Sequence, residues 1–102
     1  MIRRAMDGHW LCISQPDHAR LAGAMGEAWG RPPFLPPVPR AEVLRAVAEH
    51  DNGWVEWEAA PGLDRAAGRP FHFTEMPVAD HLVIWRRGAQ RMLEQNPYAG
   101  LL

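Results

Sequence analysis

Residues 31–40 contain five prolines, and this density of proline restricts the fold more than any other feature of the 102-residue chain. Proline fixes φ and has no backbone N–H, so the segment can form neither a helix nor a central strand. It predicts a stiff, extended connection within the fold that sets two helices apart. A chain of this length provides one hydrophobic core, so we expect a single domain over residues 1–102.

The residues before the prolines predict a β-hairpin and a helix. Apolar and β-branched residues on either side of Asp7-Gly8 indicate a hairpin within residues 1–14, with Cys12 as a small core residue in its second strand. Ser14, with Asp17 three residues later, is typical of a helix start, and Gly30 follows the end of a helix over about residues 15–29. The stripe predicted to be buried comprises His18, Leu21, Ala22, Met25 and Trp29.

Two further helices are expected after the prolines, over about residues 41–58 and 78–95, separated by a loop rich in glycine and proline. The core-facing positions expected in the last helix are His81, Leu82, Trp85, Ala89, Met92 and Leu93. The predicted fold class is therefore mainly α, a helical domain with an N-terminal β-hairpin. Because residues 96–102 are apolar and uncharged, we expect an incomplete portion of a longer helical fold, or self-association through this end.

Composition excludes several classes of function. The net charge of −1 gives no basic surface for nucleic acid. All eleven basic residues are arginine, so Schiff-base chemistry and a P-loop lysine are excluded. No apolar run is long enough to span a bilayer, and no signal-peptide pattern opens the chain, so a cytoplasmic protein is expected. The single cysteine has no partner for a disulfide or a thiolate site.

The adjacent pair His50-Asp51 lies inside an apolar helical stripe, and His18 lies on the apolar face of the earlier helix. Buried polar groups cost free energy unless they are partnered, so these residues need a metal, a hydrogen-bond network or a ligand. Imidazole and carboxylate are common ligands of zinc, iron and manganese. Neighbouring helical residues point about 100° apart, so both can reach one ion only if it lies between two helices. His18 is the ligand expected from the facing helix.

Other residues are expected at the edge of this site. We consider three additional ligands, His72, His81 and Asp80. The residues expected to line a pocket or hold an anionic group are Trp54, Trp57, Arg20 and Arg45. Arginine suits the anion because it offers a planar fork of donors.

The chain resembles two families. A helical histidine followed by a helical His-Asp pair resembles the arrangement found in the HD-domain phosphohydrolases. This resemblance implies a divalent metal held by His18, His50 and Asp51. More closely, QPDHARLA (15–22), HDNGW (50–54), PGLD (61–64) and GRP (68–70) with Phe73 resemble the uncharacterised bacterial family called domain of unknown function 3891.

The HD pattern also places a last aspartate ligand on a later helix, and this sequence has no aspartate after Asp80. Three alternatives follow. Asp80 or Asp64 takes the place of this last ligand, the ligand belongs to a portion of the protein missing from this sequence, or the site holds no metal. Two functions remain open. One is a metal-dependent hydrolase of a small phosphorylated molecule. The other is a non-catalytic helical module whose buried His–Asp network fixes packing or binds a small ligand or partner.

Overall fold

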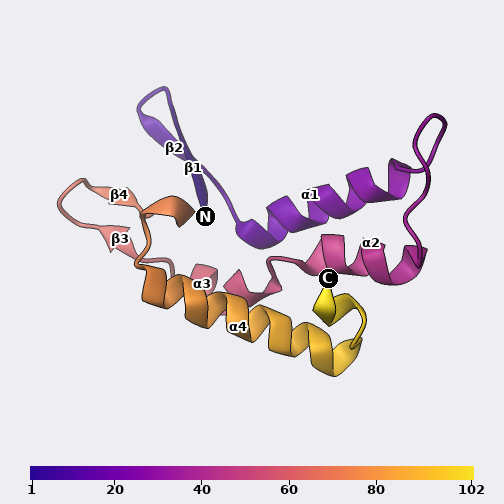
Figure 1. The fold of residues 1–102 in the computed structure, drawn as a ribbon. Helices are drawn as coiled ribbons and strands as arrows, with labels where there is room; N and C mark the ends of the chain where they lie inside the picture. The colour runs from indigo at the N-terminus through magenta and orange to yellow at the C-terminus, as the bar shows by residue number, and fades with distance from the viewer.

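A computed structural model describes all of residues 1–102, and it is mainly helical, as predicted. Helix α1 lies above α2, and α4 lies below it, while the β-hairpin projects from one side (Figure 1). The principal helices and the hairpin strands are α1 (Gln15–Ala28), α2 (Arg40–Glu49), α4 (Val78–Gln95), β1 (Ile2–Met6) and β2 (His9–Ile13). None of the helices is both long and apolar enough to cross a bilayer.

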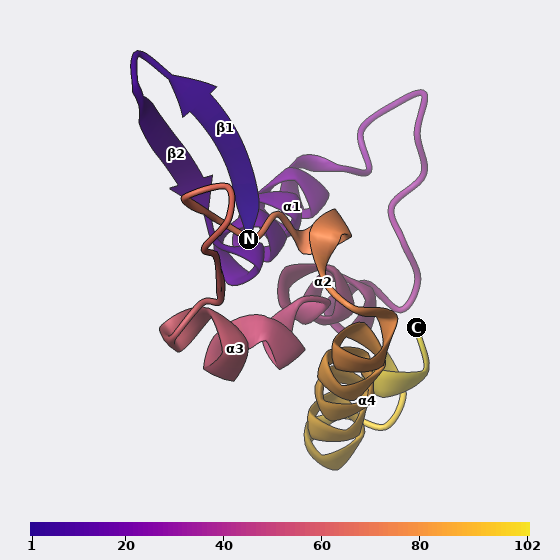
Figure 2. The same cartoon turned by 90° about the vertical axis from the view of Figure 1, so that its left-hand side faces the viewer.

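The predicted hairpin is confirmed. β1 and β2 pair antiparallel, from Ile2 opposite Ile13 to Met6 opposite His9. Asp7 and Gly8 both have positive φ, 48° and 78°, which is typical of a two-residue turn that matches the twist of its strands. The hairpin extends away from the helices (Figure 2), and every residue of β2 is exposed. The prediction that Cys12 is a core residue is therefore wrong, because no helix covers this strand.

An ion pair between Arg3 and Glu75 joins the hairpin to the rest of the chain. The Arg3 guanidinium donates to both carboxylate oxygens of Glu75, at 2.7 and 2.8 Å. Glu75 ends the short 3-10 helix η2 (Phe73–Glu75), and the backbone N–H of Phe73 donates to the Met1 carbonyl at 2.8 Å. Arg3, the backbone N–H of His72 and Arg69 lower the pKa of Glu75 to about 2, with the Arg3 hydrogen bond the largest cause.

We expect Glu75→Gln to lower stability at pH 7. Because the folded pKa is below the ordinary value of 4.5, the contribution of Glu75 is fully present above about pH 4.5 and is lost as the pH falls towards 2. The difference in urea midpoint between wild type and variant should therefore shrink across this range. Glu94→Gln, at an exposed carboxylate outside the ion pairs, is the matched control. A constant difference from pH 7 to 2.5 would contradict the assignment.

Helix α1 begins as predicted but buries a different face. The Ser14 side chain accepts a hydrogen bond from the backbone N–H of Asp17 at 3.0 Å. The buried residues are Gln15, Ala19 and Gly23. A Cβ at Gly23 would lie 2.7 Å from the Cβ of Ala48 in α2, so small residues let the two helices approach closely.

The prediction that the apolar stripe of α1 is buried is therefore wrong. Leu21 is 63% exposed, Met25 66% and Trp29 54%, because the small-residue face makes the contact with α2 instead. His18 is also exposed, at the edge of that contact.

The single helix predicted over residues 41–58 is broken in the structure. α2 ends at Glu49, a 3-10 turn η1 (Asn52–Trp54) follows, and α3 covers Val55–Ala59. The reason is the contact of Gly53 with α4, where a Cβ would lie 2.2 Å from the carbonyl oxygen of Ile84. A continuous helix would not bring this backbone against α4.

Helix α4 spans Val78–Gln95, as predicted, but its buried residues are Ile84, Gly88 and Met92. Of the six positions expected to face the core, only Met92 is buried; Leu82 and Trp85 are more than half exposed. Arg91 donates to the Asn52 carbonyl at 2.8 Å and pairs with Glu56. The helix is therefore rotated so that its small residue Gly88 meets η1.

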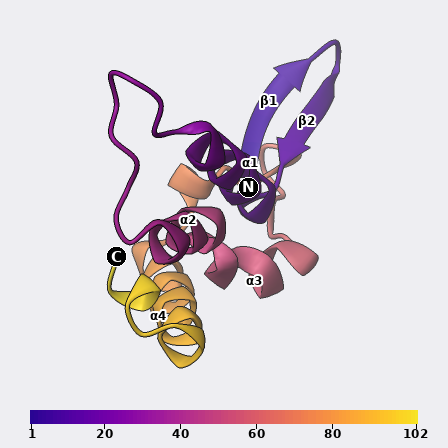
Figure 3. The same ribbon diagram turned by 90° about the vertical axis from the view of Figure 1, so that its right-hand side faces the viewer.

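The core is small and lies at the contact between η1 and α4. Trp54, Met76 and Ile84 form it, and three partly buried aromatic side chains pack against them: Trp57, Phe71 and Phe73. Two short strands, β3 (Leu63–Asp64) and β4 (Arg69–Pro70), pair antiparallel beside it. The radius of gyration is 15.8 Å, against about 13 Å for a compact chain of this length, so the elements form an open arrangement (Figure 3).

The apolar end of the chain forms the 3-10 turn η3 (Ala99–Leu101), which packs on α4 and α2. Ala99 is buried there, while Leu101 and Leu102 remain exposed. Self-association through this end stays a prediction.

Candidate metal centre

The structure brings His18, His50 and Asp51 together. Each offers one ligand atom, and these atoms lie within 4.8 Å of one another. The two imidazole rings meet edge to face, with centroids 5.5 Å apart and an interplanar angle of 82°. His18 comes from the first turns of α1, and the His-Asp pair from the end of α2, so the cluster joins two helices.

The break after α2 allows the side chains of His50 and Asp51 to lie on the same side of the backbone, beside His18. His50 still has helical angles, φ −58° and ψ −24°, but Asp51 has left the helix, with φ −104° and ψ 17°. In a continuous helix these neighbours would point about 100° apart. The departure of the backbone from helical geometry therefore accompanies the convergence of both side chains on His18.

The hydrogen bond made by His50 defines which of its nitrogens carries a proton. Nδ1 lies 2.7 Å from the Val47 carbonyl oxygen, which can only accept, so Nδ1 is the donor. In the neutral ring, Nε2 then presents a lone pair, and it lies 3.3 Å from Oδ2 of Asp51. A cation beside Nε2, either a proton or a metal ion, would make the contact between these two electron-pair donors favourable. A backbone carbonyl on the second nitrogen is also the usual support of a metal-binding histidine.

Asp51 is the buried member of the cluster, with its side chain 12% exposed against 43% for His50. Burial raises the pKa of Asp51, because it disfavours the charged carboxylate; the positive charges of His50, His18 and the N-terminus oppose this effect. The only ion pair of Asp51 is with His50. Its charge is therefore incompletely compensated by the protein.

Glu58 fixes the start of α1 beside this cluster. Its carboxylate, 5% exposed, accepts the backbone N–H of Gln15 at 2.8 Å and forms an ion pair with the Met1 ammonium group. Gln15 is itself buried and lies three residues before His18. Neither residue was predicted from the sequence, because nothing in the local pattern marks a glutamine and a glutamate so far apart as partners.

The structure does not bring the additional ligand candidates to the cluster. His72 begins η2, where Nδ1 lies 2.9 Å from the Thr74 hydroxyl. His81 stacks on Trp85, with centroids 5.4 Å apart. Asp80 is exposed in the first turn of α4.

The four residues expected to line a pocket or hold an anion also make contacts outside the cluster. Trp54 is a core residue, with 2% of its surface exposed, and Trp57 packs edge to face against it and lines a separate pocket with Asp80 and Ile84. Arg20 pairs with Asp17. Arg45 pairs with Glu49 and hydrogen-bonds Gln95, so its guanidinium extends towards α4.

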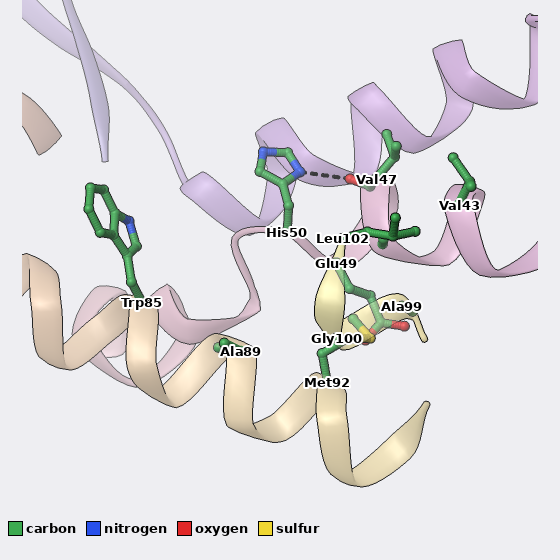
Figure 4. A pocket seen from close by; sticks show the side chains of 12 residues that line it. Val43, Val47, Glu49, His50, Trp85, Ala89, Met92, Ala99, Gly100 and Leu102 are labelled. Atoms are coloured by element: carbon green, nitrogen blue, oxygen red, sulfur yellow. Dashed lines mark hydrogen bonds between the residues drawn. The ribbon is translucent and has the colours of Figure 1, made fainter. Parts of the chain in front are cut away.

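A groove between α2 and α4 adjoins the cluster (Figure 4), and it was not predicted from the sequence. Its volume is about 460 Å³, and His50 is one of its lining residues. Its other principal side chains are Val43, Val47, Trp85, Ala89, Met92 and Leu102. Their apolar character alone could not reveal it, because they come from segments far apart in the chain.

The fold and the cluster define a mainly helical protein with an N-terminal β-hairpin and a His–His–Asp group that could hold a metal ion. The chain belongs to the family described as "Protein of unknown function (DUF3891)", whose model matches residues 1–102. This confirms the closer of the two predicted resemblances. No curated protein matches the chain, and no solved structure does, so the HD-like fold stays a prediction.

Proposed function

We propose that His18, His50 and Asp51 bind one divalent cation and that the protein is a metal-dependent hydrolase of phosphate esters, of the HD type. The observation that carries the proposal is the 3.3 Å contact between Nε2 of His50 and the Asp51 carboxylate. The proton on Nδ1 is already donated to Val47, so a cation beside Nε2 would satisfy both the lone pair and the buried charge.

The donor set suits zinc, iron or manganese. Ligand atoms of a tetrahedral zinc site lie about 3.3 Å apart, given metal–ligand distances near 2 Å. The atoms of the cluster lie within 4.8 Å, so small side-chain rotations would close the site. Three protein ligands leave coordination positions for water and substrate. A bound ion would supply Lewis acidity, activating water near neutral pH and polarising a phosphoryl oxygen.

The residues of the chain would divide the remaining tasks. Asp51 would provide the negative charge that retains the ion, from a position largely shielded from solvent. His18 and His50 are exposed, so a small phosphorylated molecule could approach from their side. Val47 would hold the His50 ring in the tautomer that leaves Nε2 free.

The test of catalysis is hydrolysis by metal-free protein and by protein reconstituted with Zn²⁺, Mn²⁺ or Fe²⁺. We expect turnover of p-nitrophenyl phosphate or bis(p-nitrophenyl) phosphate only after reconstitution, with loss in His18→Ala and retention in His72→Ala. No turnover of either ester with any ion, despite stoichiometric binding, would overturn the hydrolase and leave the metal site.

A second candidate follows from the same contact. If a proton fills the gap between Nε2 and Asp51, the pair is an ion pair between imidazolium and carboxylate that fixes the junction of α1, α2 and η1. The protein would then be a non-catalytic module, as a satisfied polar network can specify packing without chemistry.

Thermal unfolding separates these two candidates. A bound metal at one hundred times its dissociation constant should stabilise the fold by about 2.7 kcal/mol, and a chelator should remove that gain. His72→Ala, outside the cluster, should gain as much as wild type. An unchanged melting temperature with saturating Zn²⁺, Mn²⁺ and Fe²⁺ would favour the non-catalytic module.

A further inference from the structure

The groove between α2 and α4 exists because these helices are held apart at both ends. At one end η1 lies against α4, where Gly53 and Gly88 bring the two backbones together. At the other end η3 lies against both helices, and Gly100 fits against Leu93. Between these contacts the helices leave a space of about 460 Å³, which falls in the range of small-molecule sites.

The lining of the groove is mostly apolar. Eight of its twelve lining residues are hydrophobic, and Glu49 and His50 are the two with ionisable side chains. Transfer of an apolar ligand from water into such a groove is favourable by about 0.8 kcal/mol for each buried methylene group. A ligand of this groove therefore carries an alkyl or aryl group.

The cluster lies at one end of this apolar surface. Val43, Val47 and His50 occupy positions i, i+4 and i+7 of α2, so they follow one face of the helix. Figure 4 shows His50 above Ala89 of α4, and Val43 and Val47 at the end of the groove where Leu102, Ala99 and Met92 lie. His50 thus belongs both to the groove and to the His–His–Asp cluster.

We propose that the groove binds the apolar part of an amphiphilic phosphate ester, placing its phosphate at the cluster. This inference rests on the proposed function for the phosphate but not for the apolar group. The length of the groove favours a small molecule over a docked protein segment. α2 has ten residues and spans about 15 Å, and η1 and η3 lie at the two ends of the groove.

Calorimetric titration tests the groove with three probes: octyl phosphate, methyl phosphate and 1-octanol. We expect Zn²⁺-loaded protein to bind octyl phosphate at least ten times more tightly than methyl phosphate. 1-Octanol, which has no group for a metal, should bind the metal-free protein as well. Equal affinities for the two phosphates would overturn the proposal, as would failure of 1-octanol to bind.

Variants locate the binding. Ala89→Trp should fill the groove and abolish both the octyl preference and 1-octanol binding, whereas Ala24→Trp, at an exposed position of α1 outside the groove, should retain both. Val43→Thr keeps the side-chain shape but replaces a methyl group with a hydroxyl group, so it should weaken 1-octanol binding several-fold. This second variant keeps the test decisive if Ala89→Trp does not fold. Unchanged 1-octanol binding in a folded groove variant would place the site elsewhere. Binding of 1-octanol without hydrolysis of octyl phosphate would sustain the groove and count against the hydrolase.

Discussion

Gly53→Ala should lower the free energy of unfolding by about 3 kcal/mol or more, as measured by urea denaturation. The added Cβ would lie 2.2 Å from the Ile84 carbonyl oxygen and 2.9 Å from the backbone nitrogen of Gly88. Both are backbone atoms inside α4, so they cannot move aside as a side-chain end can. Overpacking of this kind forces backbone shifts, and its cost is at the upper end of single substitutions.

Gly26→Ala is the matched control, because it adds the same methyl group at another close contact between elements. There the nearest atom is Cδ2 of Leu44, at 3.0 Å, which is the flexible end of a side chain. Gly26 lies inside α1, where alanine is favoured over glycine by about 1 kcal/mol. We expect unchanged or higher stability. Equal losses in Gly53→Ala and Gly26→Ala would contradict the close contact between η1 and α4.

Asp51→Asn should lower the affinity for Zn²⁺ and Mn²⁺ at least a hundred-fold without lowering the stability of the metal-free protein. The amide has nearly the same shape but no charge, so it is a much weaker ligand. Burial raises the pKa of Asp51, which means that the fold disfavours its charged form, and the substitution removes that cost. Opposite effects on binding and stability are expected of a residue kept for function.

Competition with a chromophoric chelator measures the affinity, and urea denaturation in EDTA measures the stability. Asp80→Asn is the control, since Asp80 is exposed and lies outside the cluster. It should leave the metal affinity unchanged. If Asp51→Asn destabilised the metal-free protein while metal binding stayed intact, the carboxylate would be a structural partner of His50.

The sequence predicted those elements whose signals are local. The Asp7-Gly8 turn, the Ser14 cap and the bounds of α4 each depend on residues within a few positions of one another. The three clustered residues were also predicted, because two histidines and an aspartate on apolar stripes are costly without a common partner.

The buried faces of the helices could not be predicted in the same way. A hydrophobic stripe indicates which face gains most from burial, and on α1 it favoured Leu21 and Met25 over Ala19 and Gly23. The structure instead uses the small residues, since they allow α1 to lie close to α2. Such a contact depends on the matching residue of the partner helix, Ala48, which periodicity in one segment does not reveal.

The break after His50 has a similar origin. Asp51 leaves helical geometry where Gly53 meets Gly88, thirty-five positions further along the chain. The same contact lies beside the groove between α2 and α4, which Gly88 helps to line. The ligand types were thus visible in the sequence, while their convergence depended on a long-range backbone contact.

Anomalous diffraction from crystals grown with Zn²⁺ or Mn²⁺, recorded on both sides of the metal absorption edge, tests the central claim most directly. We predict a single strong anomalous peak within bonding distance of His18, His50 and Asp51. A well-ordered crystal with no peak at this cluster, or with a peak only at other residues, would contradict the metal centre.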